Sequence, residues 1–247
     1  MEKYFRSNKL RFNWQLGLFL ILLFGIPRFV LVMEANRTGG YGLISIIFLI
    51  MWLVPFVLLN KAGQKLIGIR KPRNYRWLLP SFLLGILACS FVFALGIYLY
   101  ELQIENWFVY ISKSYGGIPQ ESLSGNDKTI HFLVLVLTGM TFSPIGEELL
   151  YRGLIHQSFV PLFGDNKASI IDSLAFAVVH LAHFGLIFST GGWKFVFIPA
   201  MIWMALMFFS SRLFFYCKKK ANSIYGAIVC HAGFNFAMTY FIFYHIF

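Results

Sequence analysis

The sequence is poor in charged residues, and this shortage excludes a soluble domain. Only 13% of its 247 residues are charged, whereas soluble globular domains carry about 25%. Hydrophobic residues make up 58% of the chain and aromatic residues 19%. Together with a mean hydropathy of +0.70, this composition predicts an integral membrane protein.

Cysteine is scarce as well. The three cysteines, Cys89, Cys217 and Cys230, are odd in number, far apart in sequence, and placed in or beside apolar segments. Neither a disulfide framework nor a CxxC metal site is supported by this distribution. We therefore interpret all three as packing residues.

Acidic residues are outnumbered by basic ones, 10 to 21. No nucleic-acid-binding motif accompanies the net charge of +11, so we expect no nucleic-acid partner. Instead, Lys and Arg concentrate in three segments, 1–12, 61–76 and 212–220, while the intervening polar segments are mixed in charge. The positive-inside rule then predicts a cytoplasmic N-terminus and an external C-terminus.

Long apolar runs dominate the rest of the chain. Seven stretches are each close to the roughly 20 residues that a membrane-spanning helix needs. They lie at about 13–33, 41–59, 77–100, 129–149, 169–188, 193–215 and 222–246. We therefore predict an all-α, polytopic membrane bundle of about seven transmembrane helices, forming one membrane domain. Residues 101–128 form the longest external loop, in which "ELQIENWFVYISK" is typical of a helix at the membrane interface.

The stretch "SPIGEELLYRG", Ser143 to Gly153, carries three charges at the end of an apolar run. Glu148 and Arg152 are four residues apart, so they share a helix face and are expected to form a salt bridge. Glu147 is rotated by about 100° from Glu148. Because one arginine cannot easily neutralise both carboxylates, Glu147 is expected to face a cavity, where intramembrane carboxylates are usually functional.

Two other apolar segments contribute histidines. His180 lies in "FAVVHLAH", and His231 lies in "HAGFN", where it shares a helix face with Asn235. Residue counts from the span ends place Glu147, His180 and His231 at similar depths, toward the cytoplasmic half of the membrane. An active site inside the bundle is therefore expected. The remaining histidines are interpreted as packing residues: His131, His156, His183 and His245.

Three ordered motifs combine these residues: EExxxR (Glu147, Glu148, Arg152), FxxxH (Phe176, His180) and HxxxN (His231, Asn235). The set resembles the CPBP (Abi-type) family of intramembrane proteases, which includes CAAX prenyl endopeptidases and bacteriocin-processing or immunity proteins. The resemblance spans 147–235. It implies a catalytic helical core in 129–247, whereas 1–128 holds N-terminal transmembrane helices and the external loop, with no recognised signature.

The resemblance implies intramembrane peptide-bond hydrolysis. Glu147 and His180 would orient and deprotonate a water molecule, and His231 with Asn235 would hold the oxyanion. Structural support would come from Glu148, Arg152 and Phe176.

The sequence does not decide whether the site binds a metal ion. A Glu–His–His set can bind zinc, and Glu147, His180 and His231 would be its ligands. The sequence has no HExxH motif and no cysteine ligand. We favour a mechanism that requires no cofactor, and keep a divalent metal such as zinc as the alternative.

Two other functions stay open. A non-catalytic membrane scaffold or bacteriocin-immunity protein could keep the same fold, and buried Glu and His could serve a proton-coupled transporter. The paired broken helices of many transporters are absent from the pattern. For the protease we expect a membrane-associated substrate in the plasma membrane, such as a prenylated protein, a leader-bearing bacteriocin or a peptide pheromone. Oligomeric state is not predicted.

Overall fold

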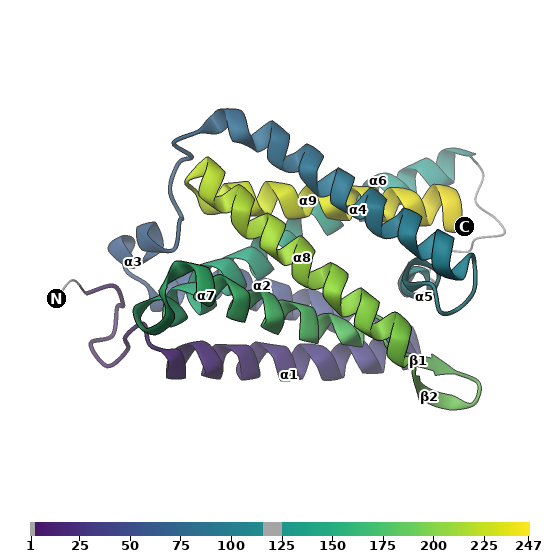
Figure 1. Ribbon diagram of the computed structural model, residues 1–247, viewed down its shortest axis with the longest axis horizontal. Helices are drawn as coiled ribbons and strands as arrows, with labels where there is room; N and C mark the ends of the chain where they lie inside the picture. Colours follow the sequence, from purple (N-terminus) through teal and green to yellow (C-terminus); the bar gives the residue numbers. More distant parts are fainter. Residues whose placement is uncertain (1–2, 116–124) are drawn as a thin grey trace.

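A computed structural model describes residues 3–115 and 125–247 as a helical bundle with one small β-hairpin (Figure 1). The long helices are α1 (Trp14–Thr38), α2 (Gly42–Leu58), α4 (Leu78–Tyr100), α6 (Gly125–Glu147), α7 (His156–Val179), α8 (Phe197–Ala221) and α9 (Ile224–Phe241). The short elements are α3 (Lys61–Leu66), α5 (Trp107–Ser112), the π-helices η4 (Glu148–Ile155) and η6 (Ile242–Ile246), and the 3₁₀ turns η1 (Tyr75–Trp77), η2 (Lys113–Tyr115) and η5 (His180–Ala182).

Several helical runs are long and apolar enough to cross a membrane. They are Trp14–Thr38, Tyr75–Tyr100, Asp127–Ala182, Phe197–Ala221 and Ile224–Ile246, and the shorter α2 is apolar as well. These helices indicate an integral, multi-pass membrane protein. Its orientation in the membrane stays a prediction.

The run Asp127–Ala182 reverses direction within itself. Gly164 has a φ of +73°, in the region that glycine adopts freely. His156 Nδ1 lies 2.8 Å from Asp172 Oδ2, although a continuous helix would separate these residues by about 24 Å. The run therefore contains two helical segments joined at Gly164. The apolar helices of the described residues lie where the sequence predicts spans, and the number that cross a membrane stays a prediction.

The two ends of the bundle differ in character (Figure 1). One end carries the N-terminus, α3, the Gly164 turn and the lysines Lys218–Lys220 in the last turn of α8; we call it the basic end. The other end carries the C-terminus, α5 and the β-hairpin; we call it the hairpin end. The two ends of the chain thus lie at opposite ends of the bundle (Figure 1).

Close backbone contact holds α4 against α9, the helix of the HxxxN motif. A Cβ atom on Gly85 would lie 1.9 Å from the carbonyl oxygen of Cys230, and one on Gly233 would lie 2.2 Å from that of Phe82. Only glycine fits at either position, as is common where membrane helices pack closely. This contact fixes the position of α9, and with it His231.

The predicted span 169–188 is too long. Helix α7 ends at Val179, His180–Ala182 form a 3₁₀ turn, and the chain then enters an antiparallel hairpin of β1 (Leu186–Ser189) and β2 (Gly192–Phe195). Positive φ angles at Gly185 and Gly192 divert the backbone from the helix. His180 therefore caps α7 instead of lying inside it, and the next helix begins at Phe197, later than the predicted 193.

The segment 101–113, predicted to be a helix at the membrane interface, is only partly α-helical and packs inside the bundle. Only α5 is α-helical there, and Trp107 and Phe108 are fully buried by protein. Trp107 Nε1 donates to the carbonyl of Val92 at 3.2 Å, and its ring stacks on Trp203. The aromatic residues of this segment thus pack inside the bundle. The part of the predicted loop at 116–124 lies outside the described residues. All three cysteines are free and buried, which confirms their role in packing.

Candidate active site

A buried ion pair between α1 and α6 forms the centre of the site. Arg28 Nη2 lies 2.5 Å from Glu147 Oε1, and the two side chains are 2% and 0% exposed. The sequence predicts a Glu147 without a counter-charge, whereas the structure supplies one from far earlier in the chain. The signal was present: Arg28 lies well inside the first apolar span, and an intramembrane arginine needs a partner.

Glu148 has a separate set of partners. Its Oε2 forms the predicted ion pair with Arg152 Nε at 3.2 Å, which confirms that expectation. Its Oε1 lies 2.8 Å from Nδ1 of His231 on α9. Because a carboxylate accepts hydrogen bonds, Nδ1 carries the hydrogen and donates it. The π-helix η4 begins at Glu148, and such elements are frequent at functional sites.

His231 is held between the two glutamates. Its Nε2 lies 3.6 Å from Glu147 Oε2, opposite the hydrogen bond from Nδ1 to Glu148, and its ring stacks on Phe214 at 4.6 Å. One turn further along α9, Asn235 Nδ2 donates to the carbonyl of Gly139 at 2.9 Å. An amide nitrogen has two hydrogens, so this bond leaves one for another acceptor.

The tautomer of His180 follows from its contacts. Nδ1 lies 2.6 Å from the carbonyl oxygen of Phe176 and therefore donates to it. Nε2 lies 3.4 Å from Arg28 Nη2, and because arginine can only donate, Nε2 is the lone-pair nitrogen. Trp203 Nε1 also donates to the His180 carbonyl at 3.0 Å. His180 is thus a neutral hydrogen-bond acceptor.

His183, which the sequence assigns to packing, also lies in the site. Its Nε2 accepts from Arg28 Nη2 at 3.3 Å, and its ring lies 5.5 Å from that of His180. The other histidines assigned to packing lie elsewhere: His131 against the backbone of Asp127, His245 against Phe93, and His156 at the basic end.

These residues surround a cavity of about 200 Å³. Its polar wall includes Arg28, His180, His183, His231 and Asn235. Its apolar wall includes Phe48, Phe176, Trp203, Phe214 and Phe234. No acidic side chain of the described residues lines it. A mainly apolar cavity with a few convergent polar groups is the usual form of a small binding site.

The predicted metal ligands, Glu147, His180 and His231, lie around Arg28 in this arrangement, and metal use stays a prediction. Across 3–115 and 125–247, no group of three His, Cys, Asp or Glu side chains could hold a metal ion. The guanidinium of Arg28 lies between Glu147 and His180, and this fixed positive charge opposes a cation beside it. The chemistry proposed below uses no metal.

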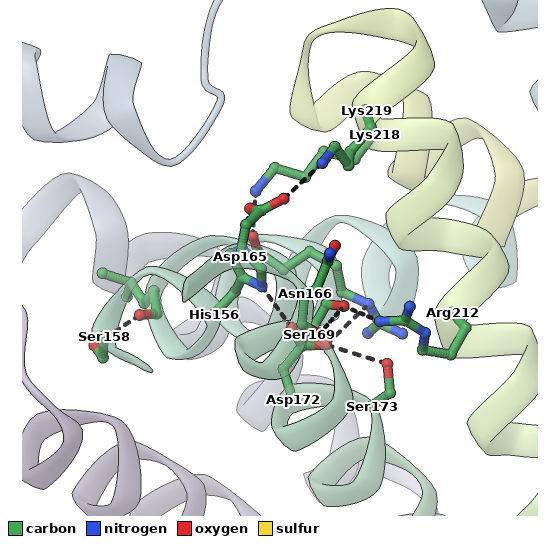
Figure 2. A network of polar contacts seen from close by, with 12 residues as sticks. His156, Ser158, Asp165, Asn166, Ser169, Asp172, Ser173, Arg212, Lys218 and Lys219 are labelled. Carbon is green, nitrogen blue, oxygen red and sulfur yellow. Dashed lines mark hydrogen bonds and ion pairs between the residues drawn. The ribbon is translucent and has the colours of Figure 1, made fainter. Parts of the chain in front are cut away.

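A second polar network at the basic end includes His156, Asp165 and Asp172 (Figure 2). Arg152 connects the site to this network. Its Nε lies 4.0 Å from Asp172 Oδ1. Asp172 in turn lies 2.8 Å from His156 Nδ1, and His156 Nε2 lies 3.1 Å from Asp165 Oδ1. Asp165 also accepts from Lys219 Nζ at 2.6 Å. The network therefore extends from the buried Arg152 to solvent.

Helix α8 is tied to α7 and η4 in the same network. Lys218 donates to the carbonyl of Arg152, and Arg212 donates to the hydroxyl of Ser169. At the Gly164 turn, the hydrogen bond from His156, and then that from Lys219, hold the pKa of Asp165 below its usual value. We infer that this network secures the reversal between the two helical segments.

A buried Glu–His–His–Asn set near a cavity in a helical bundle is an arrangement that suits an intramembrane hydrolase. Residues 129–237 match the family described as type II CAAX prenyl endopeptidase Rce1-like. The match confirms the resemblance seen in the motifs, and it implies a CAAX-type intramembrane protease. No curated protein and no solved structure matches the chain. Arg28 lies outside the matched segment.

Proposed function

We propose that the protein is an intramembrane endopeptidase that hydrolyses a peptide bond in a membrane-associated peptide or protein. The observation that carries the proposal is that Arg28, His180 and His231 line one cavity, and that Glu147 lies directly behind Arg28, 2.5 Å from its Nη2. Both carboxylate oxygens of Glu147 are buried without a hydrogen-bond partner in the described structure. Such groups are costly unless function uses them, and here they can accept from a water molecule.

Water activation would use Glu147 and His180 together. The water oxygen forms a bond to the carbonyl carbon of the substrate, and its proton passes to Glu147 or to Nε2 of His180. The same proton then moves to the leaving amine as the C–N bond breaks. Since Nδ1 of His180 donates to the Phe176 carbonyl, Nε2 has the lone pair that proton transfer needs. General acid–base catalysis of this kind contributes about 10²–10⁴-fold.

Oxyanion stabilisation would come from α9. The free hydrogen of the Asn235 amide can donate to the oxygen of a tetrahedral intermediate. Because Nδ1 of His231 already donates to Glu148, Nε2 joins it as a donor when the ring carries a hydrogen on both nitrogens. Glu148 holds the opposite side of the His231 ring. Arg152 supports this arrangement by pairing with Glu148 and lying over the ring of Phe176 at 4.3 Å.

The test is cleavage by purified protein in lipid nanodiscs. Fluorogenic membrane-anchored peptides, prenylated or bearing a leader sequence, would be compared for wild type, Glu147→Gln and His180→Gln. The matched control is Glu34→Gln, which removes an exposed carboxylate from α1. We expect both site variants to lose cleavage while Glu34→Gln retains it.

Two results would change the assignment. Cleavage by Glu147→Gln at the wild-type rate would sink the enzyme and favour the scaffold or immunity protein. Loss of cleavage with a chelator, restored by zinc, would instead place the same residues around a metal. The peptide that is cleaved would identify the substrate class, and protease accessibility of the two ends of the chain in vesicles would determine the orientation.

A further inference from the structure

We propose that Arg28 is a positioning residue for catalysis, so that helix α1 completes the active site from outside the matched segment 129–237. The inference rests on the proposed function, because it concerns the same reaction. It assigns to Arg28 more than the neutralisation of Glu147, namely control over where His180 presents its lone pair.

The contacts of a single nitrogen carry the inference. Arg28 Nη2 lies 3.4 Å from His180 Nε2 and 3.3 Å from His183 Nε2, and both contacts have hydrogen-bond geometry. This nitrogen has two hydrogens, which serve the two histidine contacts. The contact with Glu147 is an ion pair, since neither glutamate oxygen has a hydrogen-bond partner in the described residues. Arg28 thus orients two rings and neutralises one carboxylate.

The position of Nη2 matters for the reaction. A water molecule activated by both Glu147 and His180 must lie within hydrogen-bond distance of both, and Nη2 lies at such a point. A water molecule within reach of both groups must lie beside Nη2 and share the lone pair of His180 with it. The guanidinium also hydrogen-bonds to the side chain of Tyr151. This contact and the ion pair with Glu147 can keep Arg28 in place when water binds.

A counter-charge role and a positioning role predict different behaviour for lysine. Lysine keeps the positive charge beside Glu147, but its compact ammonium lacks the planar fork that directs hydrogens to two rings. If Arg28 supplied charge alone, Arg28→Lys would retain full activity per folded molecule. If it positions His180, kcat falls although the charge remains.

The experiment compares wild type, Arg28→Lys, Glu147→Gln and the control Arg37→Lys in nanodiscs. Arg37 lies on the same helix but pairs with Glu34 at the surface. We expect Arg28→Lys to lower kcat by about 10–10²-fold, because small misplacements of reacting groups are costly. KM should change by less than about twofold, since substrate binding is not altered. Arg37→Lys should match wild type. A wild-type kcat for Arg28→Lys overturns the proposal.

A second measurement tests the contact between Arg28 and His180 without using cleavage. It applies if Arg28→Lys does not fold, or if the wild-type protein cleaves none of the peptides. In Glu147→Gln, Arg28 is still present, whereas in Glu147→Gln/Arg28→Gln both charges are removed together. We expect the ¹⁵N resonance of His180 Nε2 to differ between these two proteins, because its donor is lost. An unchanged resonance overturns the Arg28–His180 contact. By contrast, wild-type cleavage by Glu147→Gln would overturn the proposed function and leave this contact to be decided by the resonance.

Discussion

Two histidines in this protein are each flanked by two carboxylates, yet their surroundings differ. His156 at the basic end lies 2.8 Å from Asp172 and 3.1 Å from Asp165. His231 in the site lies 2.8 Å from Glu148 but 3.6 Å from Glu147. The first cluster reaches solvent through Asp165, which is 48% exposed, whereas both glutamates of the second are fully buried.

The two clusters also differ in how many of their buried nitrogens and oxygens form hydrogen bonds. Among the described residues, buried nitrogens and oxygens without hydrogen-bond partners occur on Arg28, Glu147, Glu148 and Arg152, and on Ser211 of α8, which belongs to neither cluster. His156 and Asp172 have none. A fully satisfied network rigidifies a fold, while an unsatisfied one beside a cavity can accept a new partner. The comparison assigns structural support to the basic end and chemistry to the Glu147 cluster.

The largest expected effect concerns one carboxylate from each cluster. Glu147→Gln removes the proton acceptor with little change in shape, and we expect cleavage to fall by about 10²–10⁴-fold. Asp172→Asn, the same change at the other cluster, should lower cleavage by less than about tenfold, because it acts only through Arg152. Initial rates per folded molecule decide the comparison. Equal losses in the two variants would remove the distinction between the clusters.

The next effect separates the two histidines. We expect His231→Gln to lower kcat by about 10²–10³-fold, the usual cost of losing an oxyanion donor. His156→Gln, its matched control, should retain kcat, since His156 touches no residue of the cavity wall described here. Single-turnover cleavage in nanodiscs measures both. A His156→Gln variant as inactive as His231→Gln would show that the basic end takes part in the reaction.

The same His156→Gln variant should instead lose stability. It leaves the buried Asp172 without its 2.8 Å hydrogen bond, and an unsatisfied buried group costs about 1–3 kcal/mol. A lower midpoint of denaturant-induced unfolding in detergent would show this. An unchanged midpoint would contradict the structural role of the basic end.

A smaller effect depends on pH. Asp165 binds a proton less readily in the folded protein, because His156 and then Lys219 donate to it and lower its pKa. Its contribution to stability is therefore fully present above the unfolded pKa of about 3.9. It is lost as pH falls from there toward the lower pKa of the folded protein. Unfolding midpoints from pH 7 to pH 3 should fall less steeply for Asp165→Asn than for wild type. Parallel slopes would contradict this assignment.

The smallest effect is expected at the surface. Arg37→Gln breaks the 2.6 Å pair with Glu34, in which both side chains are about half exposed. Exposed pairs contribute about 0–1 kcal/mol, since water screens the charges. The unfolding midpoint and the cleavage rate should both stay near wild type. A large loss would show that α1 tolerates no change of charge, and would weaken Arg37 as the control for Arg28.

The amino-acid sequence by itself determined the features that depend on local spacing and hydropathy. Seven apolar stretches predicted the apolar helices, and the four-residue spacing of Glu148 and Arg152 predicted their ion pair, found at 3.2 Å. The ordered motifs predicted the family match found at 129–237. Helix periodicity places residues on one face whatever the rest of the chain does, so these inferences needed no tertiary information.

Tertiary structure alone decided which helices meet, and so which side chains become partners. Arg28 reaches Glu147, and His183 joins the site, because α1 packs against η4 and the end of α7. The close approach of α4 and α9 at Gly85 and Gly233 sets the position of His231. Contacts between distant segments depend on how side chains interlock across helices, and spacing along one helix carries no record of that. The sequence shows an arginine inside the first apolar span, and only the folded protein shows that Glu147 is its partner.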